Sequence, residues 1–219
     1  MSIVTVDFDG TLYRHNSIMD MLKAGGKAFT LKQWCYIVMN FLTGSVNRTR
    51  EDKIDLHVVL LKAFFGQMKG KNTDEMHAFF ESIIKAGHTN INYDLVSRIT
   101  KHLENGDRVV ILSGALQPFL EVFIQQLDIR ADVIGTSLLY DERGICTGEI
   151  GKLVHGIDKV NKMKLWIKEN DASGESIWAY ADSESDIPLL EFADKAVVVQ
   201  PSTAMKKIAE SKGWEIFCN

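Results

Sequence analysis

The sequence is poor in the features that mark secreted, repetitive and membrane-spanning proteins. It contains only three cysteines, Cys35, Cys146 and Cys218, whose odd number and wide spacing predict reduced thiols and no cysteine metal site. It has no internal repeat and no low-complexity segment. Its longest apolar run, residues 34–42, is interrupted by Asn40 and is too short to span a bilayer. A globular chain is therefore expected.

Positive charge is also scarce. The 25 lysines and arginines are outnumbered by 29 aspartates and glutamates, so the net charge of −4 favours neither nucleic acid nor an anionic membrane as a partner. We therefore expect no nucleic-acid partner. The chain lacks the basic region and apolar segment of a signal peptide before its first apolar stretch, and we expect a cytoplasmic protein.

Two aspartates end the first apolar stretch. Residues 3–8 are rich in β-branched side chains and predict a buried strand, which Asp7 and Asp9 close just before Gly10. The spacing of two points both carboxylates to one side of an extended backbone. Carboxylates that close repel each other unless a cation lies between them, which predicts Mg²⁺ held by oxygen ligands. A solvated turn is the alternative, because Asp and Gly are common turn residues.

The next eighty residues carry a helical pattern. Apolar residues recur at spacings of three and four, and Asn72 with Glu75 has the spacing of a capping box. Helices are expected over residues 31–42, 54–65 and 72–84, with no strand between them. We expect the apolar side chains of residues 31–42 to be buried between helices. The alternative is an apolar wall or a membrane-facing edge for a lipid phosphate.

From residue 90 onwards, helical and strand patterns alternate, which implies a parallel sheet covered on both faces. The fold class expected is therefore α/β, a Rossmann-like parallel sheet with an inserted all-α cap. Its core would comprise residues 1–13 and 97–219, and its cap residues 14–96. Strands are expected at 108–112, 131–136, 177–181 and 196–199, helices at 95–103, 118–127 and 158–168, and a hairpin at 138–150.

Three further motifs stand at predicted strand ends or helix starts. Ser113 and Gly114 follow a strand and are expected to open a helix, where a hydroxyl and an amide form a phosphate cradle. Lys159 begins a later helix, where its charge opposes the helix dipole. Asp182 and Asp186 follow another strand. Each motif has a simpler interpretation, a turn or a solvated surface lysine, but four such motifs in order are hard to obtain by chance.

In this order the motifs resemble those of the haloacid dehalogenase superfamily, most of whose members are Mg²⁺-dependent phosphatases. The helical insertion resembles the C1 cap of its phosphoserine-phosphatase-like branch, subfamily IB. The resemblance implies that Asp7 is the nucleophile, forming an aspartyl-phosphate, and that Asp9 is the general acid and base. It implies that Asp7, the backbone carbonyl of Asp9 and Asp182 bind Mg²⁺, while Asp186 holds metal-bound water or orients Lys159.

The same resemblance assigns the phosphate contacts and limits the substrate. Thr11, Ser113, the Gly114 amide and Lys159 would hold the phosphoryl oxygens. Phosphoserine phosphatases carry a glutamate where this chain has Asn16, and a cap arginine near the position of His57. A small-molecule phosphomonoester other than phosphoserine is therefore the expected substrate.

Three other functions stay open. The first is a phosphotransferase that uses the same site, and the second is a non-catalytic phosphate-binding protein. The third is a lipid-phosphate phosphatase, because the chain is similar in size and plan to the bacterial phosphatidylglycerophosphatase C family. Membrane contact is disfavoured, since residues 31–42 have only Lys27, Lys32, Arg48 and Arg50 as basic neighbours. The oligomeric state stays open.

Overall fold

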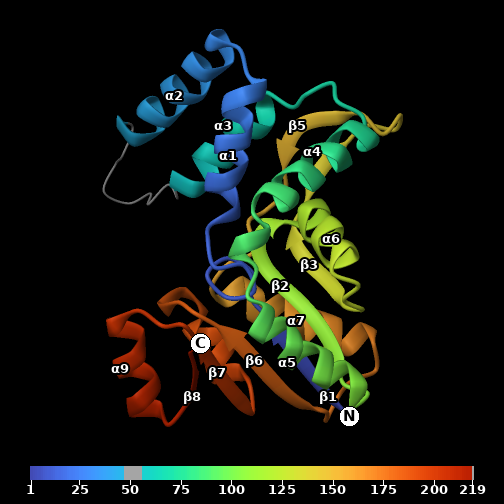
Figure 1. Cartoon of the computed structure of the whole chain (residues 1–219), viewed down its shortest axis with the longest axis vertical. Helices are drawn as coiled ribbons and strands as arrows, with labels where there is room; N and C mark the ends of the chain where they lie inside the picture. The colour runs from blue at the N-terminus through green and yellow to red at the C-terminus, as the bar shows by residue number, and fades with distance from the viewer. Residues whose placement is uncertain (47–55, 219) are drawn as a thin grey trace.

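The structure, a computed structural model, describes residues 1–46 and 56–218, apart from the side chains of residues 26–28, 40–46 and 56–58. Figure 1 shows two parts: a sheet with flanking helices, which carries both ends of the chain, and a group of helices beyond one end of the strands. The two parts are described in turn because the candidate site lies where they meet.

The sheet consists of six parallel strands in the order β3-β2-β1-β6-β7-β8. Central β1 pairs on one side with β2 and on the other with β6, so that Val6 lies beside Ile111 and Tyr180. The chain thus moves outwards from β1 in both directions, which creates the crevice at which α/β sheets bind ligands. The parallel α/β prediction is confirmed. The strands are β1 (Ser2–Val6), β2 (Arg108–Leu116), β3 (Asp132–Thr136), β6 (Ser176–Ala181), β7 (Lys195–Val199) and β8 (Glu215–Phe217).

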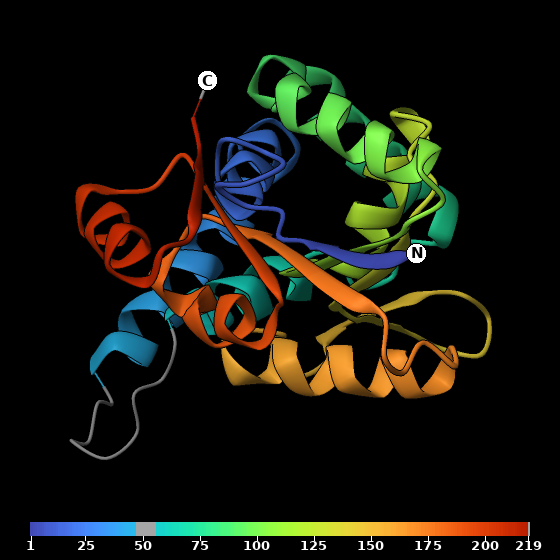
Figure 2. The ribbon, with the colours of Figure 1, turned by 90° about the horizontal axis from the view of Figure 1, so that it is seen from below.

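Helices cover both faces of this sheet, and Figure 2 shows α5 and α7 on opposite sides of the strands. Successive side chains of β1 point to opposite faces of the sheet. Val4 belongs to the hydrophobic cluster on one face, with Phe119 of α6, and Ile3 belongs to the cluster on the other face, with Met163 of α7. One face carries α5 (Tyr93–Glu104) and α6 (Gln117–Gln126), and the other carries α7 (Ile157–Glu169), α8 (Ile187–Phe192) and α9 (Thr203–Lys212).

In the described part of the chain four α-helices lie between β1 and α5: α1 (Ser17–Ala28), α2 (Leu31–Val46), α3 (Leu56–Gly66) and α4 (Thr73–Ala86). The predicted capping box is confirmed, since Asn72 accepts from the Glu75 amide at 2.8 Å and Glu75 accepts from the Asn72 amide at 3.0 Å. The helix expected from Ile54 is described from Leu56, because Ile54 lies outside the described residues.

The chain passes twice between the sheet and these helices, and the two passages lie side by side. The Arg14 amide donates to the Asn90 carbonyl at 2.7 Å, and the Asn92 amide donates to the Leu12 carbonyl at 3.0 Å. Tyr13 is buried between them, and its hydroxyl donates to Asp20 in α1 at 2.6 Å. The helical part is thus joined to the sheet through a narrow, hydrogen-bonded double connection.

The predicted hairpin forms a further contact between the two parts. Strands β4 (Leu138–Tyr140) and β5 (Cys146–Ile150) pair antiparallel and reach the helical part near the end of α3 (Figure 1). There the Cys146 amide donates to the Lys71 carbonyl at 2.8 Å, and the Gly70 amide donates to the Cys146 carbonyl at 2.9 Å. The β4–β5 hairpin is therefore joined to the helical part by main-chain hydrogen bonds.

One expected element boundary is wrong. Ser113 and Gly114 do not open a helix, because β2 continues through them to Leu116 and α6 begins at Gln117. Pro118 sets this start, since its fixed φ and missing amide suit the first turn of a helix. The strand expected to end at residue 112 therefore ends four residues later, at Leu116, because Ser-Gly is also a common turn pair, whereas the helix expected from residue 118 begins at Gln117.

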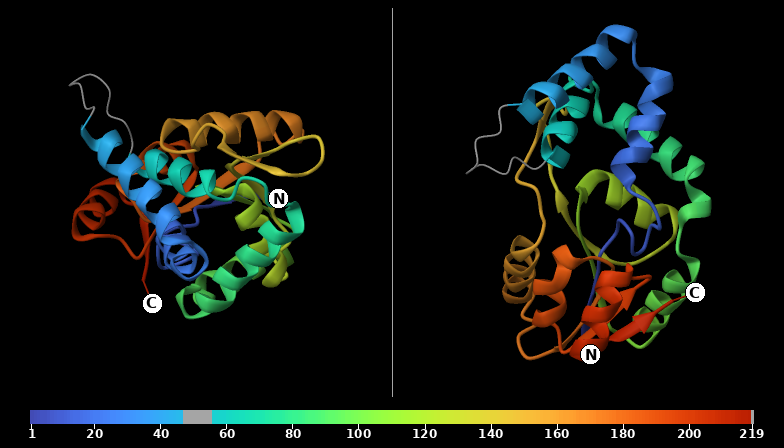
Figure 3. Two further views of the ribbon diagram at one scale, coloured as in Figure 1. Left: turned by 90° about the horizontal axis from the view of Figure 1, so that it is seen from above. Right: turned by 90° about the vertical axis from the view of Figure 1, so that its left-hand side faces the viewer.

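The expected burial of residues 31–42 is confirmed for Ile37 and in part for Trp34, but it is wrong for most of the other apolar side chains that the structure describes there. Leu31 is 81% exposed, Tyr36 53% and Met39 58%, whereas Ile37 is 2% exposed. Helix α2 lies at the end of the molecule far from the sheet (Figures 1 and 3), so only one of its sides meets other helices. Among the described residues no helix has both the length and the apolar character needed to cross a membrane.

We predict that Phe123→Ala lowers the free energy of unfolding by about 3–5 kcal/mol. The substitution removes a fully buried ring that packs edge-on against Phe8, with 4.7 Å between the ring centroids. Chemical denaturation measures the loss. Leu165→Ala is the control, because Leu165 is 48% exposed and its removal should change the same quantity by about 0.5 kcal/mol or less. Equal losses for both variants would contradict the proposed core.

Candidate active site

Three carboxylates meet at the carboxyl ends of β1 and β6. Asp7 follows β1 and Asp182 follows β6, and these strands are hydrogen-bonded neighbours. Asp186 ends a short 3₁₀ turn, residues 184–186, that leads into α8. One oxygen from each of the three carboxylates lies within 4.8 Å of the others. The strand order therefore brings together groups that are up to 179 residues apart in the chain.

Lys159 lies among these carboxylates and is 4% exposed. Its Nζ is 2.6 Å from Oδ1 of Asp7 and 2.6 Å from Oδ1 of Asp186. Burial alone would lower the pKa of Lys159, but the facing carboxylates of Asp7 and Asp186 outweigh it and hold the pKa above its ordinary value. The lysine is therefore charged, and the interpretation of a solvated surface lysine is wrong.

The Gly10-Thr11 segment holds Asp182 in place. Gly10 has φ +81°, and a Cβ there would lie 2.2 Å from Oδ2 of Asp182, so only glycine allows this approach. Thr11 is fully buried, and its hydroxyl donates to Oδ1 of Asp182 at 3.2 Å. The structure thus places the Thr11 hydroxyl on a carboxylate, although the sequence predicted a phosphate contact for it.

Asp9 points toward the first turn of α1. Its two oxygens accept hydrogen bonds from the Ser17 amide at 2.6 Å and from the Ser17 hydroxyl at 3.0 Å. Burial raises the pKa of Asp9 to about 7, although the bond from the Ser17 amide opposes the shift. The sequence analysis did not predict the contact with Ser17. Asn16 could have indicated it, because Asn16 caps α1 and the amide of Ser17, the first residue of the helix, has no partner inside the helix.

A cavity of about 460 Å³ opens over these groups. Ser113 and Gly114 border it from the end of β2, and Ser113 accepts a hydrogen bond from the Ala115 amide at 3.2 Å. The cavity therefore collects every predicted site residue except Thr11. Its described lining is Asp7, Asp9, Asn16, Ile18, Ser113, Gly114, Leu153, Val154, His155, Lys159, Asp182, Ser183, Ser185 and Asp186.

Several of these lining residues were not predicted. Ser183 donates to Oδ2 of Asp186 at 2.9 Å, and its place between two motif aspartates was a usable signal. Ile18, Leu153 and His155 reach the cavity only because α1 and the segment before α7 meet there. No sequence pattern marks a contact of that kind.

The residues present fit a divalent cation. Burial raises the pKa of Asp7 to about 7 and that of Asp182 to about 6, and in each case a neighbouring carboxylate adds to the shift. Lys159 supplies one positive charge against the three carboxylates of Asp7, Asp182 and Asp186. A cation such as Mg²⁺, which prefers carboxylate oxygens, would relieve the remaining repulsion.

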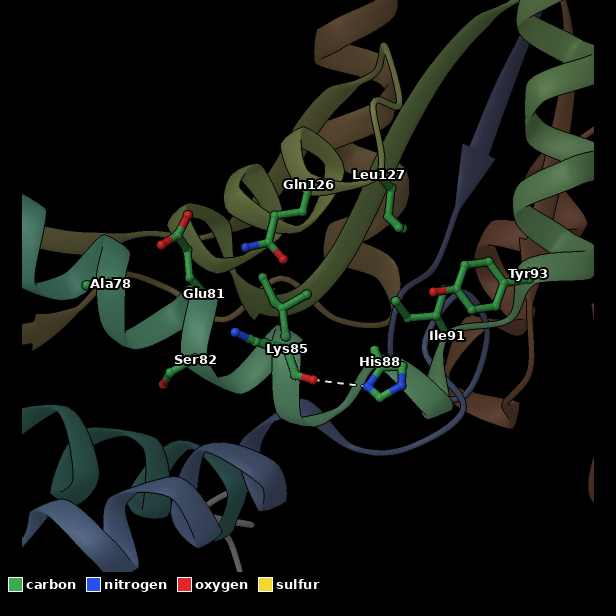
Figure 4. A pocket seen from close by; sticks show the side chains of 10 residues that line it. Ala78, Glu81, Ser82, Lys85, His88, Ile91, Tyr93, Gln126 and Leu127 are labelled. Atoms are coloured by element: carbon green, nitrogen blue, oxygen red, sulfur yellow. Dashed lines mark hydrogen bonds between the residues drawn. The ribbon is translucent and has the colours of Figure 1, made fainter.

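Another hollow, of about 530 Å³, lies between α4, the residues after it and the end of α6 (Figure 4). Its described lining includes one carboxylate, of Glu81, and His88, whose ring contacts the Lys85 carbonyl at 3.1 Å. It contains no clustered carboxylates, and we do not assign the chemistry to it.

A family model for haloacid dehalogenase-like hydrolases matches residues 4–191, which begin within β1 and include all four motifs. The chain belongs to this family. The chain is 24% identical over 151 residues to a phosphoserine phosphatase of Mycobacterium tuberculosis, covering 68% of this chain and 48% of that protein. It is 28% identical over 123 residues to a histidinol-phosphatase of Neisseria meningitidis, covering 54% of this chain and 55% of the relative. The chain thus spans about half the length of these relatives.

Solved structures show the same fold. A protein of unknown function from Bordetella pertussis superposes on this chain with a TM-score of 0.79 at 20% identity, covering 99% of this chain and 97% of the other. A probable phosphoserine phosphatase from Vibrio cholerae gives 0.65 at 15% identity, with coverages of 94% and 58%. The resemblance stated from the sequence is therefore confirmed at the level of family and fold.

We predict that Gly10→Ala weakens Mg²⁺ binding about 10- to 100-fold, because the new methyl group displaces Asp182. The Mg²⁺ dependence of the unfolding temperature measures this. Gly174→Ala is the matched control, since Gly174 also has a positive φ, +87°, but nothing lies within 4 Å of its Cβ position. If Gly10→Ala bound Mg²⁺ as tightly as Gly174→Ala does, the methyl group would not displace Asp182 and the steric argument would fail.

We also predict that the metal-free protein loses stability as the pH rises from about 4 to about 7. Asp7, Asp9 and Asp182 each have a folded pKa above the ordinary 3.8, so the folded state binds these protons more tightly than the unfolded chain does. Their contribution is complete below pH 3.8 and disappears as the pH passes their folded pKa values, about 7, 7 and 6.

Mg²⁺ should therefore raise the unfolding temperature more at pH 8 than at pH 5, because it binds the deprotonated carboxylates. Thermal unfolding in EDTA and in Mg²⁺ across this range tests both statements. Asp182→Asn removes one of the titrating groups and should flatten the metal-free curve. A metal-free protein that gained stability between pH 4 and 7 would show that the carboxylate cluster is not strained.

Proposed function

We propose that this hydrolase is a Mg²⁺-dependent phosphatase that cleaves a small phosphomonoester through an aspartyl-phosphate on Asp7. Residues 1–13 and 97–219 would form the catalytic core and residues 14–96 the cap. The observation that carries the proposal is the group formed by buried Asp7, Asp186 and Lys159 with half-buried Asp182 at the switch point of the sheet.

Asp7 would supply the nucleophile. Oδ1 of Asp7 accepts from Lys159 at 2.6 Å, which leaves Oδ2 to form the bond to phosphorus as the ester oxygen departs. Asp7, Asp182, Asp186 and the carbonyl of Asp9 are the groups that would hold Mg²⁺, whose charge offsets the repulsion between carboxylate and phosphate. The sequence led us to expect Asp186 behind the metal ligands, holding water or orienting Lys159. We propose it as a ligand because one of its oxygens lies within 4.8 Å of an oxygen of Asp7 and of Asp182.

Asp9 would donate a proton to the departing ester oxygen. It would then take a proton from the water that cleaves the acyl-phosphate, which restores the Asp7 carboxylate and releases phosphate. A pKa of about 7 suits both transfers near neutral pH. Both oxygens of Asp9 contact Ser17, so Asp9 has to leave Ser17 to act. Movement of α1 with the cap would therefore be coupled to the availability of this proton.

The phosphoryl oxygens would be held by Ser113, the Gly114 amide and Lys159, which border the cavity. Because the Ser113 oxygen accepts from the Ala115 amide, its hydrogen is directed elsewhere and can serve the phosphate. Thr11 would act through Asp182 and need not touch the phosphate.

The substrate proposed is not phosphoserine, although that substrate is named for one relative and histidinol phosphate is implied by the name of another. Asn16, which lines the cavity, carries no charge to bind an ammonium group. The side chain of His57 lies outside the described part of the chain. A lipid phosphate is the second candidate, favoured by the exposed apolar side chains of α2, Leu31, Val38 and Met39. Phosphoryl transfer to another alcohol would use the same residues.

Phosphate release from a panel of phosphomonoesters tests the proposal, with p-nitrophenyl phosphate as a general probe and a dispersed lipid phosphate as one member. We expect release in Mg²⁺ and none in EDTA. Asp7→Asn should lower kcat at least about a thousandfold, because the amide cannot form the acyl-phosphate. Asp94→Asn is the control and should keep full activity, since Asp94 is exposed on α5 and outside the cavity lining.

Two results would change this conclusion. If no member released phosphate from folded, Mg²⁺-bound protein, the phosphatase function would be wrong. If an added alcohol became phosphorylated at the expense of phosphate release, the chain would be a phosphotransferase.

A further inference from the structure

The cavity extends beyond the carboxylates into a second region, the leaving-group side. Two chain segments form it: the start of α1, with Asn16 and Ile18, and residues 153–155 ahead of α7. A Cβ on Gly114 would lie 3.2 Å from the Val154 carbonyl and 3.8 Å from Cδ1 of Leu153, so this wall adjoins the proposed phosphate site. A phosphate ester bound over Asp7 has to place its alcohol here.

The walls of this side are largely apolar. Ile18 is 8% exposed and Val154 3% exposed, and Leu153 packs against the core cluster that includes Ile18. Asn16 and His155 add polar groups at the edge. The Asn16 side-chain oxygen accepts from the Met19 amide at 3.2 Å, so its amide nitrogen can donate to a substrate. His155 is exposed, and its ring can donate or accept.

The described charged side chains of the cavity are the four aspartates and Lys159, and Lys159 already contacts both Asp7 and Asp186. Only Asp9 among them adjoins the leaving-group side, through its contacts with Ser17 of α1. In the proposed reaction Asp9 carries the proton for the departing ester oxygen, so it is not a carboxylate partner for an ammonium group. The described lining therefore offers the alcohol no cation to pair with a carboxylate and no free carboxylate to pair with an ammonium. A charged group buried without a partner is strongly disfavoured.

We propose that the phosphate removed by this hydrolase is esterified to an uncharged, hydroxylated alcohol. Its carbon atoms contact Ile18 and Leu153, and its hydroxyl groups bond to Asn16 and His155. This assignment rests on the phosphatase activity proposed above and adds to it the chemical class of the leaving group.

Matched pairs of small substrates test the assignment. Glycerol 3-phosphate and 3-phosphoglycerate differ by a carboxylate, and 2-hydroxyethyl phosphate and phosphoethanolamine differ by an ammonium. We expect kcat/KM to be at least about tenfold higher for the uncharged member of each pair, because the charged member loses solvation without gaining a partner. Equal or higher values for the charged members would overturn the assignment.

Two variants probe the residues named. Asn16→Asp keeps a good helix cap, so the protein should fold, and it places a carboxylate on the leaving-group side. The preference for 2-hydroxyethyl phosphate over phosphoethanolamine should then fall about tenfold or reverse. His155→Gln should raise KM for glycerol 3-phosphate about three- to tenfold with little change in kcat, as expected for one lost neutral hydrogen bond.

His88→Gln is the matched control, because His88 lies in the separate hollow of Figure 4 and should leave every kinetic constant unchanged. An unchanged preference in Asn16→Asp would overturn the role of Asn16 and with it the assignment. p-Nitrophenyl phosphate separates the two levels of the argument. Its Mg²⁺-dependent hydrolysis alongside a preference for charged alcohols would overturn only this inference, whereas failure with every substrate would overturn the proposed phosphatase function itself.

Discussion

The structure of the site depends on one buried arrangement of charges, in which Lys159 contacts Asp7 and Asp186 at 2.6 Å each. Three carboxylates that close, removed from water, would repel one another and favour the neutral acid form. Lys159 is the one lysine or arginine among the described residues lining the cavity, so it offsets only part of this repulsion. The site therefore keeps a net negative charge at the point where β1 and β6 end. That charge makes the site receptive to a divalent cation.

This arrangement also explains why the helical part is inserted where it is. Asp9 follows Asp7 by two residues, and its carboxylate is bound by Ser17 at the first turn of α1. The passage from sheet to helices therefore begins within the site. Beside it runs the return passage, tied to it by the Arg14–Asn90 and Asn92–Leu12 hydrogen bonds. A shift of the helices is transmitted directly to a group that we propose donates and accepts the proton.

The two ends of the cavity have opposite characters, and each has a structural origin. The phosphate end is charged because the carboxyl ends of parallel strands converge there. The leaving-group side is apolar because Ile18 and Leu153, which line it, belong to the same packed cluster as the helical part. None of the described side chains of α2 lines this wall, and its described exposed apolar side chains lie far from the sheet. Recognition of the alcohol and any contact made by α2 are thus separate properties of the helical part.

The sequence by itself determined the sheet, the helical insertion and the four motifs. Strand and helix periodicities are local, and Asp7, Asp182 and Lys159 each stand at an element boundary that a short window reveals. Tertiary structure decided the rest. Elements that are distant in the chain decide three features of the site. They bury Lys159, they bring Asp186 to the other carboxylates, and they determine what Asp9 contacts. The sequence also misjudged α2, since an apolar helix is buried only where neighbours surround it, and periodicity does not count neighbours. His155 reaches the site through packing, which no local pattern marks, whereas the helix cap at Asn16 was a local signal for Ser17.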